Sequence, residues 1–66
     1  MYQLKEIVLT QEELEAIKLN DFDGLEQIEA AEKMNTSQST FQRILASARA
    51  KIAEAVIEGK ALRIEE

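Results

Sequence analysis

The 66-residue sequence contains no cysteine, histidine, tryptophan or proline. Without cysteine and histidine, the chain has no disulfides, thiolate nucleophiles, imidazole bases or usual transition-metal sites. Its carboxylate pairs, such as Glu12 with Glu13 and Asp21 with Asp23, lack a nearby nucleophile and the ligand spacing of a calcium loop. We therefore expect a protein that is not an enzyme and binds no cofactor, metal or small molecule.

Long apolar runs are also missing. No stretch approaches the roughly 20 apolar residues of a membrane-spanning helix, and Met1 does not open a signal peptide. A chain of this length hides only about 60% of the surface that its unfolded form exposes. These features predict one marginally stable, cytoplasmic domain over residues 1–66, which a partner subunit would stabilise.

Basic residues are scarce and unevenly placed. The net charge of −5 disfavours DNA binding, because affinity for DNA comes largely from Lys and Arg at phosphates. However, residues 33–53 hold four basic residues and no acid, whereas residues 1–32 and 54–66 are acidic. This basic block is typical either of a DNA-facing surface or of an ordinary solvated helix face.

Capping residues predict where three helices begin and end. Thr10 and Glu13 form a capping-box pattern at the start of the first helix, and residues 20–24 are expected to end it. The second helix is expected from residue 25 or 26 to residue 33. Ser37 caps a third helix that starts at Gln38 and ends at Gly59.

Apolar residues at helical spacing predict the core. From the three helices in order, the residues expected to point inward are Leu14, Ile17 and Phe22, then Ile28, Ala30 and Ala31, then Phe41, Ile44, Leu45, Ala48, Ile52, Ala55 and Val56.

Residues 3–9 and 60–65 are expected to be short extended segments without a strand partner in the chain. Together with an outward-facing Ile57, they favour a homodimer that pairs through its terminal segments or the C-terminal halves of its long helices. The dimer surface is predicted to include Ala53, Ile57, Leu62 and Ile64.

The spacing within residues 27–46 predicts a helix-turn-helix motif. Ala31 is small where two helices would cross, and Asn35 tolerates the left-handed backbone that the turn between them requires. Phe41 and Ile44 would anchor the second helix. Such a joint lets this recognition helix enter the major groove of DNA with its N-terminal residues leading.

The outward residues of the recognition helix are suited to double-stranded DNA. Gln42 can pair with adenine and Arg43 with guanine, each contributing about 1 to 3 kcal/mol of discrimination. We predict base contacts from Gln38, Ser39, Gln42 and Arg43, and phosphate contacts from Lys33, Ser37, Thr40, Arg49 and Lys51. Replacing Arg43 should then relax preference at one base, whereas replacing Lys51 should weaken binding to all sequences alike.

Several segments together resemble an uncharacterised prokaryotic family, UPF0251/DUF134, of predicted helix-turn-helix DNA-binding proteins. They are residues 8–10, 13–16, 29–34, 39–41, 43–45, 47–49 and, most specifically, the closing run 58–65. The middle is similar to region four of sigma factors at Ser37, Thr40, Phe41 and Arg43. The resemblance implies an all-α fold of three to four helices with short extended terminal segments, acting as a transcriptional regulator.

The chain also departs from that family. The members usually begin with a further basic, proline-containing segment, and this sequence starts where that segment would end. The phosphate contacts of such an arm would be missing, which would weaken DNA binding. The alternative function is therefore a protein-interaction or dimerisation module that has the helix-turn-helix fold but little DNA affinity.

Overall fold

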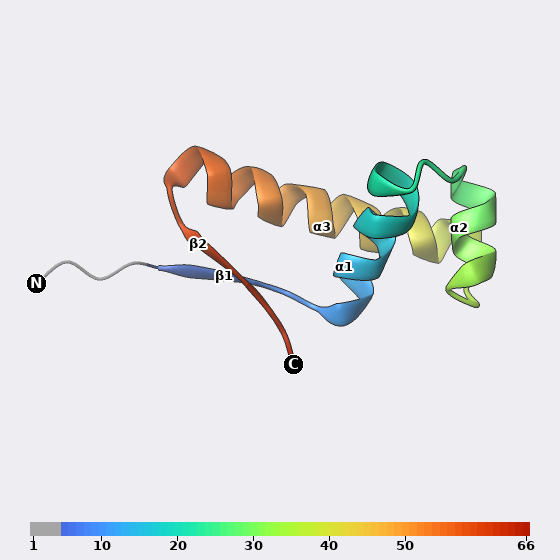
Figure 1. Cartoon of the computed structure of the whole chain (residues 1–66), viewed down its shortest axis with the longest axis horizontal. Coiled ribbons are helices and arrows are strands. Elements are labelled where there is room, and N and C mark those ends of the chain that lie inside the picture. Colours follow the sequence, from blue (N-terminus) through green and yellow to red (C-terminus); the bar gives the residue numbers. More distant parts are fainter. Residues whose placement is uncertain (1–4) are drawn as a thin grey trace, which may run out of the picture.

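One long helix, α3, runs along the length of the molecule (Figure 1). A computed structural model describes residues 5–66. Three shorter helical segments gather at the N-terminal end of α3, and two strands lie beside its C-terminal half. In chain order the elements are β1 (Glu6–Leu9), α1 (Gln11–Ile17), the π-helical turn η1 (Lys18–Phe22), α2 (Gln27–Lys33), α3 (Gln38–Glu58) and β2 (Ala61–Ile64).

The predicted helix caps are confirmed. The Glu13 N–H donates to Thr10 Oγ1 at 3.1 Å, and the Thr10 N–H donates to Glu13 Oε1 at 2.8 Å, which completes the capping box of α1. Ser37 Oγ accepts the Thr40 N–H at 3.2 Å, and α3 ends at Gly59, whose φ is 67°. The left-handed backbone at Gly59 turns the chain back along α3.

The core forms where α1, η1 and α2 meet the first half of α3. Its buried residues are Ala16, Leu19, Ala30, Ala31, Phe41 and Leu45, with Ile17, Leu25, Met34 and Ile44 packed at the edge. Ala48 and Ala55 continue the buried face of α3 as predicted, with Ile52 half-buried between them. Alanines at the helix contacts bring the backbones close together, so a small chain can enclose Phe41 completely.

Four residues expected in the core are instead exposed: Leu14, Phe22, Ile28 and Val56. Phe22 is 83% exposed because η1 has wider turns than an α-helix, as its Lys18 C=O to Asp23 N–H bond of 2.7 Å shows. The wider turns shift the phase of the positions that follow, so Phe22 points away from the core, whereas Leu19, three residues after the buried Ala16, points inward. Ile28 lies opposite the alanine face of α2, and Val56 lies beyond the reach of α1 and α2.

The chain is mostly helical, as predicted, and has extended segments near both termini. The prediction that these segments lack a strand partner is wrong, so the class is not purely all-α. β1 and β2 pair as a parallel two-stranded sheet, with Glu6 opposite Ala61 and Leu9 opposite Ile64. They pair because Gly59 sends β2 back beneath α3, beside β1. The extended segments predicted at 3–9 and 60–65 agree with these strands, except that residues 3 and 4 lie outside the described residues.

Within residues 5–66, no helix combines the length and the apolar character required to cross a bilayer.

Candidate nucleic-acid interface

The turn between α2 and α3 fixes the direction in which α3 begins. Asn35 has a φ of 60°, as its sequence position predicted. The Asn35 N–H donates to the Glu32 C=O and the Thr36 N–H donates to the Ala31 C=O, both at 3.0 Å. Because these bonds satisfy carbonyls at the end of α2, the turn needs only four residues before α3 starts.

Packing on both sides of the turn holds the two helices together. Ala31 on α2 is 2% exposed and Phe41 on α3 is fully buried, while Ile44 lies at the edge of the same core. These three residues occupy the positions that the sequence pattern assigned to the helix crossing and its anchors. The outward side chains of the first two turns of α3 are therefore presented on a fixed backbone.

Those outward side chains are polar and exposed: Gln38, Ser39, Gln42 and Arg43. The first turn of α3 also contains no acidic residue, whereas α1 begins with Glu12 and Glu13. At the cap, Ser37 Oγ lies 3.0 Å from Thr40 Oγ1 and 3.3 Å from Ser39 Oγ. This helix end thus combines a positive dipole end with three hydroxyl groups, and no carboxylate in that turn neutralises it.

The basic residues of the molecule divide into two groups. Within residues 5–66, Lys18, Arg49, Lys51, Lys60 and Arg63 form ion pairs with carboxylates of the same chain. Among the same described residues, Lys33 and Arg43 have no such partner, and both are exposed. Lys5, which precedes β1, also has none and is exposed, whereas Lys33 and Arg43 lie on either side of the turn that precedes α3.

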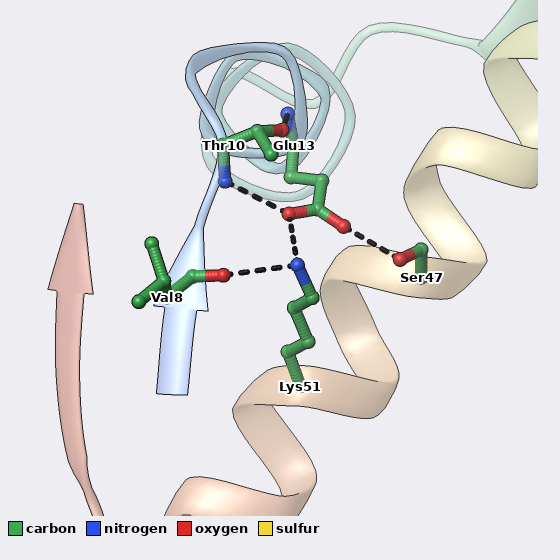
Figure 2. A network of polar contacts seen from close by, with 5 residues as sticks. All are labelled: Val8, Thr10, Glu13, Ser47 and Lys51. Atoms are coloured by element: carbon green, nitrogen blue, oxygen red, sulfur yellow. Dashed lines mark hydrogen bonds and ion pairs between the residues drawn. The ribbon is translucent and has the colours of Figure 1, made fainter. Parts of the chain in front are cut away.

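Lys51 belongs to a partly buried polar network that joins β1, α1 and α3 (Figure 2). Its ammonium donates to Glu13 Oε1 at 2.8 Å and to the Val8 C=O at 2.9 Å, while Ser47 Oγ donates to Glu13 Oε2 at 2.5 Å. The Glu13 side chain is only 8% exposed. A phosphate contact by Lys51 remains a prediction, and it would require this ammonium to leave two acceptors.

The network changes the acidity of Glu13. Burial raises the pKa of this carboxyl group, but hydrogen bonds from Lys51, Ser47 and the Thr10 backbone, together with the Lys51 charge, outweigh burial and lower the pKa to about 2. Glu13 is therefore ionised at neutral pH although it is buried. The sequence identified this residue only as a cap. The spacing of Ser47 and Lys51, one turn apart on α3, was the signal of a shared partner.

Arg49 also has a carboxylate partner, but this pair is more exposed than the Lys51–Glu13 pair. Its guanidinium donates to both carboxylate oxygens of Asp21, at 2.6 and 3.1 Å, and to Asn20 Oδ1 at 3.0 Å. The hydrogen bond from Arg49 lowers the pKa of Asp21. This pair is half-exposed, so Arg49 can exchange its partner for a phosphate more readily than Lys51 can. Its predicted phosphate contact also remains a prediction.

A shallow cleft of about 450 Å³ separates the start of α1 from the first half of α3. Arg43, Thr40, Ile44 and Ser47 line one side, and Thr10, Glu12 and Glu13 line the other. Arg43 thus has solvent on one side and, across the cleft, the carboxylates of Glu12 and Glu13 on the other. Within residues 5–66, no group of three carboxylates is placed to hold a metal ion.

The residues predicted for a dimer surface lie on the C-terminal half of α3 and on β2. Ala53 and Ile57 are exposed on the C-terminal half of α3, and Ile57 is 82% exposed. Leu62 is 43% exposed and Ile64 half-buried on β2. Ala53 and Ile57 thus lie several turns along α3 from its polar start, whereas Ile64 pairs with Leu9, next to the start of α1.

The fold and this surface define a small, mostly helical domain whose longest helix begins with exposed polar side chains. The chain belongs to the family described as "Protein of unknown function DUF134", which matches residues 2–66. A UPF0251 protein of Thermoanaerobacter pseudethanolicus is 57% identical over 65 residues, covering 98% of this chain and 55% of the relative. One from Dehalococcoides mccartyi is 60% identical over 62 residues, covering 94% and 53%.

The chain spans about half the length of the curated relatives it matches. No solved structure matches it significantly.

Proposed function

We propose that this chain is a helix-turn-helix domain of the sigma-region-four type that binds double-stranded DNA in a sequence-dependent way, as part of a transcriptional regulator. In this proposal α2 is the first helix of the motif and α3 is the recognition helix. The first two turns of α3 enter the major groove, and the C-terminal half of α3 remains outside it.

One observation carries the proposal: the free cations and exposed amides of this region gather around one helix start. Arg43 has no internal carboxylate partner within residues 5–66, and Gln42 beside it is exposed. Arg and Gln are the side chains that bind guanine and adenine edges bidentately. If Arg43 were only a solvated surface residue, nothing would explain why it lacks a carboxylate partner while Arg49 and Lys51, further along α3, each have one.

The proposed contacts follow from position. Gln38, Ser39, Gln42 and Arg43 face base edges, because they project from the leading turns of α3. Lys33, Ser37 and Thr40, with the free N–H groups of the first turn, face phosphates on either side. Arg49 is a further phosphate contact if it leaves Asp21.

The test is selection of bound sequences from a random duplex pool at low salt, followed by affinity measurements against salt. We expect one enriched motif, and a slope of log K against log salt of about −2 to −4, since two to four cations would neutralise phosphates. If no motif is enriched and binding is undetectable at low salt, the proposal is wrong and the domain is an interaction module with little DNA affinity.

A further inference from the structure

The cleft between the start of α1 and the first half of α3 has sides of opposite charge. Its volume of about 450 Å³ lies within the roughly 300 to 1,000 Å³ of small-molecule sites. Arg43 lines the α3 side, Glu12 lines the α1 side, and both residues are exposed. Within residues 5–66, these two residues form no ion pair with each other or with any other residue. A cation and an anion therefore lie on opposite sides of the cleft, and no ion pair joins them.

The other carboxylate of the cleft is already used by the fold. Glu13 Oε1 accepts the Thr10 N–H and the Lys51 ammonium, and Glu13 Oε2 accepts Ser47 Oγ (Figure 2). Because both oxygens have donors, Glu13 adds negative charge to the α1 side but offers little to a further partner. Glu12 is thus the carboxylate of this side that is available to a ligand.

The rest of the lining is apolar or carries hydroxyl groups. Ile44 is half-buried at the edge of the core and contributes apolar surface to the cleft. Thr10 and Thr40 line the cleft from opposite sides. Apolar surface with a few convergent polar groups is the usual composition of a small-molecule site.

The two charges select one class of ligand. A simple anion would be attracted by Arg43 but repelled by Glu12 and Glu13, and a simple cation would meet the reverse situation. A molecule with a carboxylate at one end and an ammonium at the other satisfies both sides. The guanidinium can bind the carboxylate bidentately, and the Glu12 carboxylate can accept the ammonium.

We propose that this cleft binds a small zwitterion whose ammonium and carboxylate are separated by a short apolar segment, as in an ω-amino acid or a dipeptide. The carboxylate of the ligand pairs with Arg43, its ammonium pairs with Glu12, and its apolar segment packs on Ile44. The two sides of the cleft come from distant parts of the chain, which is why the sequence alone predicted no small-molecule ligand.

NMR titration of the unmodified chain tests the site with three probes of similar length: 6-aminohexanoate, hexanoate and hexylamine. At millimolar concentrations, 6-aminohexanoate should shift the backbone amides of the residues that line the cleft and leave the amide of Ile57 unchanged. It should bind at least about threefold more tightly than either of the other probes, because each of these lacks one exposed ion pair. If the lining amides do not shift, or if hexanoate binds equally well, the proposal is wrong.

Matched variants assign the two ends of the ligand. Glu12→Gln should reduce the affinity for 6-aminohexanoate to that for hexanoate. Glu15→Gln makes the same charge change at an exposed position of α1 outside the cleft, and it should leave the affinity unchanged. Arg43→Gln should reduce the affinity to that for hexylamine. If Glu12→Gln and Glu15→Gln have equal effects, the cleft does not hold the ammonium, and the proposal is wrong.

The effect of the ligand on DNA binding rests on the proposed function, whereas the site itself does not. A carboxylate on Arg43 occupies the guanidinium that is proposed to bind a guanine edge. Saturating 6-aminohexanoate, which adds no net charge, should therefore weaken binding of the native chain to its selected duplex at least about threefold. A chain that binds no duplex would contradict the proposed function and leave the NMR result standing. Unchanged duplex affinity with the cleft occupied would overturn the link between the ligand and DNA.

Discussion

The two halves of α3 carry similar basic residues in opposite situations. Arg43, in the first half, is exposed and has no carboxylate partner within residues 5–66. Lys51, in the second half, is held by Glu13 and by the Val8 carbonyl. On the same helix, Arg43 is therefore available to a binding partner, whereas Lys51 is used in contacts within the fold. The basic block of residues 33–53 is therefore not one surface.

The largest expected effect is on stability, at Lys51. Lys51→Met leaves the buried Glu13 carboxylate without its cation and should cost about 2 to 3 kcal/mol of unfolding free energy. This is below the usual loss for a fully buried pair, because the Lys51 side chain is 34% exposed. Arg43→Met is the matched control and should change stability by less than about 0.5 kcal/mol. Equal urea midpoints for the two variants would remove the distinction between the halves.

The same network should make stability depend on pH. The pKa of Glu13 falls from 4.5 to about 2 on folding, so its contribution is complete above about pH 5 and decreases as pH falls toward 2. The total is about 3 kcal/mol, of which more than half should be lost by pH 3. Urea unfolding of Glu13→Gln should lack this part of the pH dependence, whereas Glu15→Gln, at an exposed position of α1, should keep it.

A smaller effect is expected at the turn that orients the first half of α3. Asn35→Val should cost about 1 to 2 kcal/mol, because a β-branched residue is strained at a φ of 60°. Asn35→Gly should remain within about 0.5 kcal/mol of the native chain. Thermal unfolding of both variants checks this, and a Val variant as stable as the Gly variant would show that the turn tolerates another conformation.

The smallest expected effect on stability is at Arg49, which lies near the middle of α3. Asp21→Asn removes the carboxylate partner of Arg49 while leaving a side chain of the same shape. The unfolding midpoint should hardly change, because the pair is half-exposed. Affinity for random duplex at low salt should rise severalfold as the guanidinium becomes available to phosphates. Unchanged affinity would place Arg49 outside the DNA interface.

Local sequence signals predicted the helix boundaries well. Caps such as Thr10 with Glu13, Ser37 and Gly59 act within a few residues, so their chemistry can be read from the sequence. The left-handed conformation of Asn35 was predictable for the same reason. Nothing local indicated the wide turns of η1, and the inward position assigned to Phe22 was therefore wrong.

Long-range contacts could not be predicted from the same signals. The pairing of β1 with β2 depends on the path of α3 between them, and each strand alone has only four residues. Likewise, the role of Lys51 depends on Glu13, which lies 38 positions away. The sequence located the basic block, but it could not indicate which of the four cations the fold would use internally.

The proposed DNA-reading surface is tested most directly by measuring the binding of Arg43→Ala and Lys33→Ala to a selected duplex and to random duplex. We expect Arg43→Ala to weaken binding to the selected duplex by about 1 to 3 kcal/mol more than binding to random duplex. Lys33→Ala should weaken both equally and make the salt slope about one unit shallower. Unchanged binding by both variants, with the native chain binding the selected duplex, would contradict the assignment of the first half of α3 as the DNA-reading surface.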